Sequence, residues 1–196
     1  MLYEHMHLLS FPSKLQFSDE ELFEFCMKNQ EINIERDSEM NLIIWPLSGA
    51  LASTWNVTVA SQLTLWNLKA NTGVVFPAFT GFIFPNKSMR SPDTSWLSNG
   101  QWNKLSKKQK EQFAPVCPEF VVEIMSPFED WEHLQTKMDE YIANGVKLGW
   151  LFDVQNETVF IYTSNGKTES VKGFNQTIKA DNTLPGFELD LSLFKQ

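Results

Sequence analysis

A carboxylate interrupts the most apolar stretch of the sequence. Residues 120–125 are Phe-Val-Val-Glu-Ile-Met, a pattern that predicts a buried strand with Glu123 inside it. A carboxylate in such a run costs free energy unless it is paired, hydrogen-bonded or bound to a cation. Glu123 is therefore the sharpest candidate for chemistry, although a structural glutamate held by a salt bridge produces the same pattern.

Asp93 and Glu35 are the next candidate acids. Asp93 follows Ser91-Pro92 at the start of a predicted strand, a pattern that is also typical of a turn. Glu35 lies in the alternating stretch 32–36, which forms a predicted hairpin with residues 42–47. Four other acids are interpreted as surface or capping groups: Asp37, Glu39, Glu119 and Glu129.

Lys137 lies on a predicted helix that follows the strand of Glu123 and ends before Gly145. The apolar stripe of this helix consists of Trp131, Leu134, Met138 and Ile142. Tyr141 lies at the margin of the stripe, and Lys137 lies further out on the same flank. Because a helix rises about 1.5 Å per residue, its return over the sheet brings Lys137 level with the strand acids. The alternative for Lys137 is an interfacial lysine whose ammonium group stays in water. Gln135 lies nearer the centre of the apolar stripe, where an amide predicts a buried hydrogen bond.

Together these residue types suit a divalent cation. Asp93, Glu123 and the backbone carbonyl of Ile124 offer oxygen ligands, which Mg²⁺ and Mn²⁺ prefer. Such a cation polarises a phosphoryl oxygen and lowers the pKa of a bound water. Lys137 then orients that water or stabilises the developing negative charge. The set predicts a metal-dependent hydrolase.

Composition and charge narrow the class of protein. The 196 residues fit a single domain, expected over 1–196, and the two cysteines without CxxC spacing do not favour zinc. The net charge of −8 weighs against tight nucleic-acid binding, although a metal-dependent nuclease site is itself acidic. Two basic clusters are interpreted as solvated faces: Lys104, Lys107, Lys108 and Lys110, and Lys87 with Arg90. No signal peptide or membrane-spanning run is recognisable, so we expect a cytoplasmic protein without a membrane partner.

The remaining elements frame the candidate site. A capping box at Ser18 and Glu21 predicts a first helix, and a second box at Ser126 and Glu129, with Pro127 at its first position, predicts the helix that carries Lys137. A long helix is expected over 54–71, after a loop at 48–53 and before Gly73; Asn56 in its first turn faces the site or solvent. Further strands are expected at 74–79, 81–85, 90–97, 148–153 and 158–162, one short helix at 107–113, and an edge-closing tail at 184–191. This order predicts an α/β (α+β) fold with a central mixed sheet flanked by helices.

Several segments together resemble the Uma-two family within the PD-(D/E)XK nuclease superfamily. They lie at residues 34–36, 42–49, 90–96, 117–127, 137–145 and 149–153, and the similarity covers about residues 15–192. The resemblance implies a restriction-endonuclease-like core in which Asp93 and Glu123 bind Mg²⁺ or Mn²⁺. It also implies that DNA is the substrate.

Met125 departs from the usual pattern of that superfamily. A lysine normally stands two residues after the second acid, at the position of Met125. The resemblance implies that Lys137 on the following helix takes its place and that Glu35 is a helper acid. The loop at 48–52 lacks the polar residues expected of the family, which leaves the roles of that loop and of Asn56 open.

Three hypotheses follow for the function. The first is a Mg²⁺-dependent endonuclease that hydrolyses DNA phosphodiester bonds, expected as a homodimer because two strands require two sites. The second is a catalytically inactive nuclease fold that serves as a binding or assembly module, which the acidic charge and Met125 favour. The third is a hydrolase of a non-DNA phosphoester, which requires a closed pocket.

Overall fold

A six-stranded mixed sheet forms the centre of the protein, as the sequence predicts. The computed structural model describes residues 7–9, 17–126, 129–180 and 182–195. The strand order is β11-β10-β9-β8-β7-β4, and only β8 and β9 pair in parallel. These strands are β4 (Gly73–Pro77), β7 (Thr94–Ser98), β8 (Phe120–Ile124), β9 (Leu148–Asp153), β10 (Thr158–Thr163) and β11 (Thr168–Lys172).

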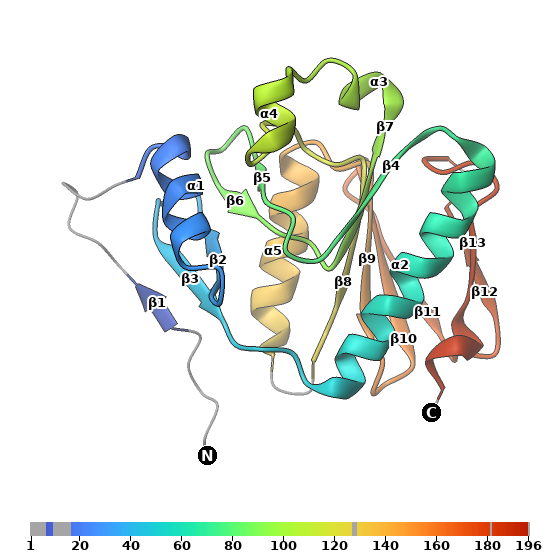
Figure 1. Cartoon of the computed structure of the whole chain (residues 1–196). Helices are drawn as coiled ribbons and strands as arrows, with labels where there is room; N and C mark the ends of the chain where they lie inside the picture. Colours follow the sequence, from blue (N-terminus) through green and yellow to red (C-terminus); the bar gives the residue numbers. More distant parts are fainter. Residues whose placement is uncertain (1–6, 10–16, 127–128, 181, 196) are drawn as a thin grey trace.

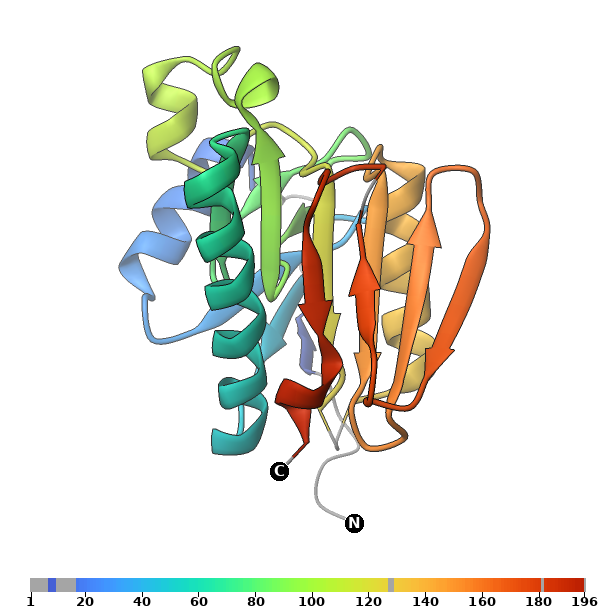
Figure 2. The ribbon, with the colours of Figure 1, turned by 90° about the vertical axis from the view of Figure 1, so that its right-hand side faces the viewer.

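Helices and the C-terminal segment cover the two faces of this sheet. Parallel neighbours need a crossover connection, and α5 (Trp131–Ala143) supplies it between β8 and β9. Figure 1 shows the sheet nearly edge-on, with α5 on one face and α2 (Ala50–Ala70) on the other. In Figure 2 the C-terminal strands β12 (Thr177–Lys179) and β13 (Glu188–Asp190) lie on the face opposite α5.

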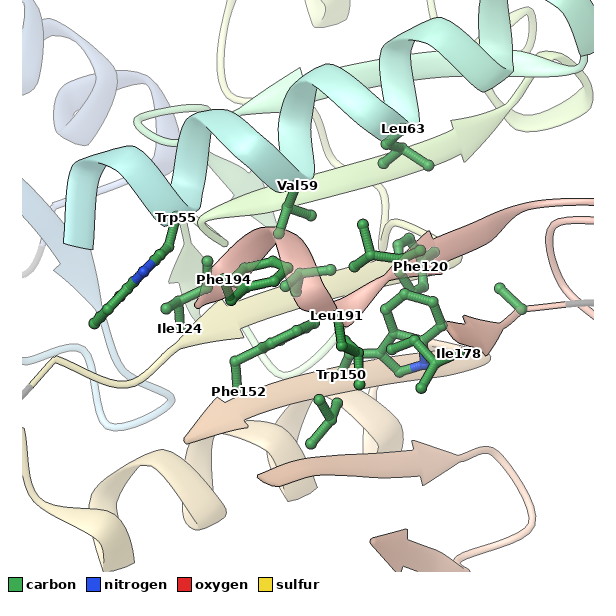
Figure 3. Close-up of a cluster of buried hydrophobic side chains, with 14 of the residues drawn as sticks. Trp55, Val59, Leu63, Phe120, Ile124, Trp150, Phe152, Ile178, Leu191 and Phe194 are labelled. Carbon is green, nitrogen blue, oxygen red and sulfur yellow. The ribbon is translucent and has the colours of Figure 1, made fainter. Parts of the chain in front are cut away.

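The face under α2 is the larger apolar core. Figure 3 shows α2 side chains directed at residues of β8 and β9, with the 3-10 helix η2 (Leu191–Phe194) beside them. The labelled members include Trp55, Val59, Leu63, Phe120, Ile124, Trp150, Phe152, Ile178, Leu191 and Phe194, all buried. Burial of this much apolar surface stabilises the sheet on which the candidate site stands.

A second sheet lies beside the first and carries Glu35. Its order is β1-β3-β2-β6-β5, with the predicted hairpin as β2 and β3. Its strands are β1 (His7–Leu9), β2 (Asn33–Arg36), β3 (Leu42–Trp45), β5 (Phe82–Ile83) and β6 (Met89–Arg90). The capping box at Ser18 and Glu21 opens α1 (Asp19–Lys28) as predicted, and Leu22 of this helix packs on the sheet.

The long helix α2 begins earlier than predicted. It starts at Ala50, within the expected loop, because Ala50, Leu51 and Ala52 are strong helix formers and Gly49 takes the N-cap position. Its C-cap is Asn71 in the left-handed conformation, at φ 51°, so Gly73 does not end the helix and instead begins β4. Asn56 consequently lies in the second turn of α2.

The helix of Lys137 begins later than predicted. Asp130 is its N-cap and accepts a hydrogen bond from the backbone N–H of Glu132, so Ser126 does not cap α5. Ser126 and Glu129 still interact, because the Ser126 N–H donates to Glu129 Oε2 at 2.6 Å. The predicted first position, Pro127, lies outside the described residues. The predicted end is confirmed, with Gly145 at φ 112° just after the C-cap.

Other boundaries differ in ways that follow from tertiary pairing. The expected strand at 90–97 is divided into β6 and β7, which belong to different sheets. The segment between β7 and β8 holds two short helices instead of the one expected at 107–113: α3 (Asn99–Trp102) and α4 (Lys107–Glu111). The tail does not close an edge of the main sheet, since β13 pairs with β12 alone in a separate two-stranded sheet. In the described part of the chain, none of the helices has the length and apolarity to span a membrane.

Candidate active site

Alternation along β8 directs Glu123 toward α5. Phe120, Val122 and Ile124 join the core under α2, whereas Val121 joins the cluster under α5. Because successive strand residues face opposite sides of a sheet, Glu123 shares the α5 side with Val121. Glu123 is 5% exposed there.

Lys137 reaches Glu123 as predicted. Its Nζ lies 2.9 Å from Glu123 Oε1, and the hydroxyl of Tyr141, one turn later, donates to the same oxygen at 2.6 Å. Both side chains are buried, so the alternative of a lysine with its ammonium in water is wrong.

Glu35 joins the same network from the second sheet. Its Oε1 lies 3.1 Å from Lys137 Nζ and accepts a hydrogen bond of 2.8 Å from the backbone N–H of Ser91. Its Oε2 pairs with the guanidinium of Arg90 at 3.2 Å. Arg90 also donates from Nε and from one terminal guanidinium nitrogen to a single oxygen, Oε2, of Glu140 on α5. Glu35 is thereby held by cations from two directions.

Asp93 lies immediately before β7 and is held by two donors. Asn56 Nδ2 of α2 donates to Oδ1 at 3.1 Å, and the backbone N–H of Ile124 donates to Oδ2 at 2.9 Å. Asn56 therefore faces the site rather than solvent. The contact with Ile124 also brings the backbone after Glu123 next to Asp93, which is where the sequence predicts the third oxygen ligand.

Burial and like charge set the protonation of the acids. Burial raises the pKa of Glu123 to about 8, and the neighbouring Asp93 and Glu35 add to this against the opposing charge of Lys137. Burial likewise raises the pKa of Asp93 to about 6. Burial acts in the same direction on Glu35, but the charges of Lys137 and Arg90 outweigh it and hold its pKa below the ordinary value.

Lys137 is a permanent cation in this setting. Burial lowers its pKa, but Glu123 and Glu35 outweigh that effect and raise the pKa above the ordinary lysine value. With every group ionised, four carboxylates face two cations in this network, which leaves a net charge of −2. The carboxylates are Glu35, Asp93, Glu123 and Glu140, and the cations are Arg90 and Lys137.

That charge balance fits a divalent cation. Hard oxygen ligands on two carboxylates and an adjacent backbone carbonyl suit Mg²⁺ or Mn²⁺. The side-chain oxygen Oδ1 of Asn56 is buried without a hydrogen-bond partner among the described residues, so an acceptor is also free beside Asp93. The described residues contain no group of three or more His, Cys, Asp or Glu side chains that suits a metal, whereas the predicted set uses only two such side chains.

Unpaired polar atoms gather around the network. Eight buried side-chain nitrogen and oxygen atoms lack a partner in the described part of the chain, and four belong to residues in or beside it. These four residues are Trp45, Asn56, Ser91 and His133. The Trp45 ring centroid lies 5.4 Å from Lys137 Nζ, and the His133 ring lies 5.4 Å from the Trp45 ring. Buried polar groups are normally paired, so this concentration is typical of a site that binds something polar.

Several predictions about individual residues are corrected. Arg90 is buried, not part of a solvated basic face, because its partners Glu35 and Glu140 come from distant elements. Glu119 is 8% exposed and bonds to Lys147 and to the Ser98 N–H, so it is not a surface group.

Gln135 is not brought to the carboxylates. It is half-buried beside the hydroxyl of Tyr162 on β10, so the expected hydrogen bond is directed away from the site. Trp45, Arg90, His133 and Glu140 are network members that the sequence analysis did not identify. Arg90 and Glu140 do lie in the segments that resemble the Uma-two family, at 90–96 and 137–145, but that resemblance assigned them no role.

Comparisons with known proteins agree with this geometry. A family model named Uma2 and described as "Putative restriction endonuclease" matches residues 19–192. A crystal structure of "a putative nuclease belonging to DUF820" from Anabaena variabilis ATCC 29413 superposes with a TM-score of 0.71. It is 18% identical, with 84% of this chain and 90% of that chain covered, which shows a shared fold. No curated protein matches. Because the family match spans most of the chain, this protein belongs to the Uma2 family, which supports a nuclease.

Proposed function

We propose that the protein is a Mg²⁺-dependent endonuclease that hydrolyses DNA phosphodiester bonds. The observation that carries the proposal is the buried meeting of Glu123, Lys137 and Glu35, with Asp93 beside them, so that the acids outnumber the lysine. A phosphodiester substrate is an anion, so such a site needs additional positive charge to accept it. The family assignment supports the same reaction class.

Asp93, Glu123 and the carbonyl of Ile124 are the proposed ligands of Mg²⁺ or Mn²⁺. When bound, the cation polarises a phosphoryl oxygen and lowers the pKa of a coordinated water. The hydrogen bonds from Asn56 and the Ile124 N–H fix the orientation of Asp93. Tyr141 does the same for Glu123, so both carboxylates are positioned before any ligand arrives.

Lys137 acts as a fixed cation rather than a proton acceptor. Its raised pKa keeps the ammonium charged at neutral pH, so it stabilises negative charge on the phosphate and orients the attacking water. Glu35 positions Lys137 through the 3.1 Å ion pair, and Arg90 in turn holds Glu35. This division of labour explains how a lysine from α5 replaces one expected at Met125.

A cleavage assay tests the proposal. Plasmid DNA and single-stranded DNA are incubated with the protein and Mg²⁺ or Mn²⁺, and products are separated on gels. We expect cleavage that requires the cation and disappears in the Asp93→Ala/Glu123→Ala double variant. Undiminished cleavage by that variant would show that the activity comes from elsewhere.

A non-catalytic binding or assembly module is the second candidate. Lys137 already pairs with both Glu35 and Glu123, and the net charge of −8 disfavours a polyanionic partner. Calorimetry with Mn²⁺ separates the candidates, because metal binding that is lost in Glu123→Gln contradicts the non-catalytic module.

We further propose a cytoplasmic homodimer, since cleavage of both strands of a duplex favours two sites related by symmetry. Size-exclusion chromatography with light scattering measures the mass directly. A monomer at the concentration used for cleavage refutes this part of the proposal.

A further inference from the structure

An open hollow of about 500 Å³ lies next to the candidate active site. Three connections of the fold form it: the turn between α1 and β2, the end of β3 with the start of the α2 connection, and the loop between β4 and β5. Its apolar lining includes Ile32, Trp45, Leu47 and Phe79, and its polar lining includes the amides of Gln30 and Asn33. Leu47 is 87% exposed and Phe79 is 70% exposed, so this lining has little cover among the described residues.

Trp45 belongs to both the hollow and the ion-pair network. It lines the hollow, and its ring centroid lies 5.4 Å from the Nζ of Lys137. Its indole N–H is buried and has no acceptor among the described residues. Trp45 therefore connects the hollow to the charged groups of the candidate active site.

Phe79 is held in an unfavourable backbone conformation on the rim of the hollow. Its φ is 68°, in the left-handed region that bulky side chains rarely adopt. Phe79 is 70% exposed. Strain of this kind persists at functional sites, where a ligand makes use of the side chain.

The chemistry of the lining selects a flat, largely neutral ligand. Aromatic rings stack on nucleobases of any sequence, and side-chain amides hydrogen-bond to base edges. Glu31 in the lining and the net charge of −8 disfavour a site built on phosphate contacts. A base within a duplex is already stacked and paired, so only an unpaired nucleotide presents its face to such a hollow.

We propose that this hollow binds an unpaired nucleobase of the substrate, next to the phosphate that is cleaved. The inference rests on the proposed function for the position of that phosphate at Asp93 and Glu123. Phe79 and Trp45 supply stacking surfaces, and the hydrogen-bonding groups are the amide of Asn33 and the Oε1 of Gln30, whose Nε2 already donates to the Met27 carbonyl. The protein therefore prefers single-stranded or locally unpaired DNA to a continuous duplex.

Fluorescence anisotropy with a labelled oligothymidylate tests this binding mode independently of cleavage. The full-length chain is titrated without divalent metal against the single strand and against the same strand in a duplex. We expect tighter binding of the single strand, and a weak dependence on salt because few phosphates are contacted. Tighter binding of the duplex with a steep salt dependence would overturn the proposal.

Substitution of Phe79 tests the stacking surface. Phe79→Asn removes the ring while asparagine tolerates the left-handed backbone, so the fold is retained and thermal unfolding verifies it. We expect about tenfold weaker binding of the single strand, with affinity retained in Phe79→Tyr. The matched control is Leu68→Asn, which removes a similarly exposed apolar side chain from α2 and leaves binding unchanged.

The outcomes separate this proposal from the proposed function. If DNA is cleaved but Phe79→Asn changes neither affinity nor product pattern, the base-binding hollow is wrong and the nuclease stands. If the oligonucleotide binds through Phe79 but no metal-dependent cleavage occurs, the nucleobase-binding proposal is supported and the proposed nuclease function is wrong. A shift from dimer to monomer in Phe79→Asn, with oligonucleotide affinity unchanged, identifies the hollow as a contact between copies of this chain and also overturns the proposal.

Discussion

The two faces of the central sheet perform different tasks with residues of the same strand. On the α2 side, β8 contributes Phe120, Val122 and Ile124 to an apolar core. On the α5 side, β8 contributes Val121 and then Glu123, which meets Lys137 and Tyr141. Neighbouring residues of β8 thus face different environments: aromatic rings on the α2 side, and the ion pairs of the candidate site on the α5 side.

The contrast between the two faces shows how the fold offsets the cost of burying a cluster of charged side chains. Taking several ions out of water costs free energy that their mutual attraction only partly returns. The apolar face supplies favourable burial that offsets this cost, with Trp150 and Phe120 in edge contact at 4.9 Å between ring centroids. One face therefore stabilises the fold, and the other holds the buried acids and the lysine of the candidate site.

The largest expected effect on stability is on the apolar face. Trp150 is fully buried, and its indole nitrogen has no hydrogen-bond partner among the described residues, so its contribution is packing. We expect Trp150→Ala to lower the free energy of unfolding by about 3–5 kcal/mol. Urea denaturation followed by circular dichroism measures it, with Trp150→Phe as the milder control. A loss below about 1 kcal/mol would contradict the assignment of stability to this face.

The next effect concerns activity on the α5 face. Lys137→Met removes the cation that faces Glu123 and Glu35, so we expect metal-dependent cleavage to fall about 10²–10³-fold. The measurement is the initial rate of plasmid nicking. Lys147→Met is the matched control, because Lys147 pairs with Glu119 instead of the candidate site. Equal losses in the two variants would remove the special role of Lys137.

A smaller effect is expected from the hydroxyl of Tyr141. Tyr141→Phe deletes its 2.6 Å hydrogen bond to Glu123, and above pH 8, where Glu123 is ionised, hydrogen bonds to charged groups contribute about 1.5–3 kcal/mol. We expect a loss of that order in the free energy of unfolding and a further rise in the pKa of Glu123, since the bond favours the carboxylate. Tyr162→Phe, on the same face beside Gln135, serves as the comparison and loses less.

The last prediction concerns the pH dependence of stability in the metal-free protein. The folded pKa of Glu123 is about 8, above its ordinary value of 4.5, so the folded state keeps a proton that the unfolded chain loses. The free energy of unfolding therefore falls as pH rises from about 4.5 to about 8, by at most about 1.4 kcal/mol per pH unit. Urea titrations in a chelator measure this slope, and Glu123→Gln reduces it. Identical slopes in the two proteins contradict the burial of Glu123.

The central acids and lysine were predictable because their signals are local. Glu123 interrupts an apolar run, and helical periodicity with a known rise places Lys137 near it. The mixed sheet followed from the order of elements. The capping box of α1 was also predictable, because both of its partners lie within three residues.

The rest of the network was not predictable because its contacts join distant parts of the chain. Arg90 reaches Glu35 and Glu140, which lie 55 and 50 residues away, and Asn56 reaches Asp93 across 37 residues. The partner of β13 likewise depends on tertiary contacts: it pairs with β12 and not with the edge of the main sheet. Local patterns fix the direction of a side chain along its element but not which element lies opposite.

The most direct test of the central claim is the position of a bound cation. Crystals soaked in Mn²⁺ are measured at the manganese absorption edge, so that anomalous scattering locates the ion without ambiguity. We expect a peak between the carboxylates of Asp93 and Glu123, on the α5 face of the sheet and within reach of the Ile124 carbonyl. A peak at other residues, or none at saturating Mn²⁺ and a pH above 8, would contradict it.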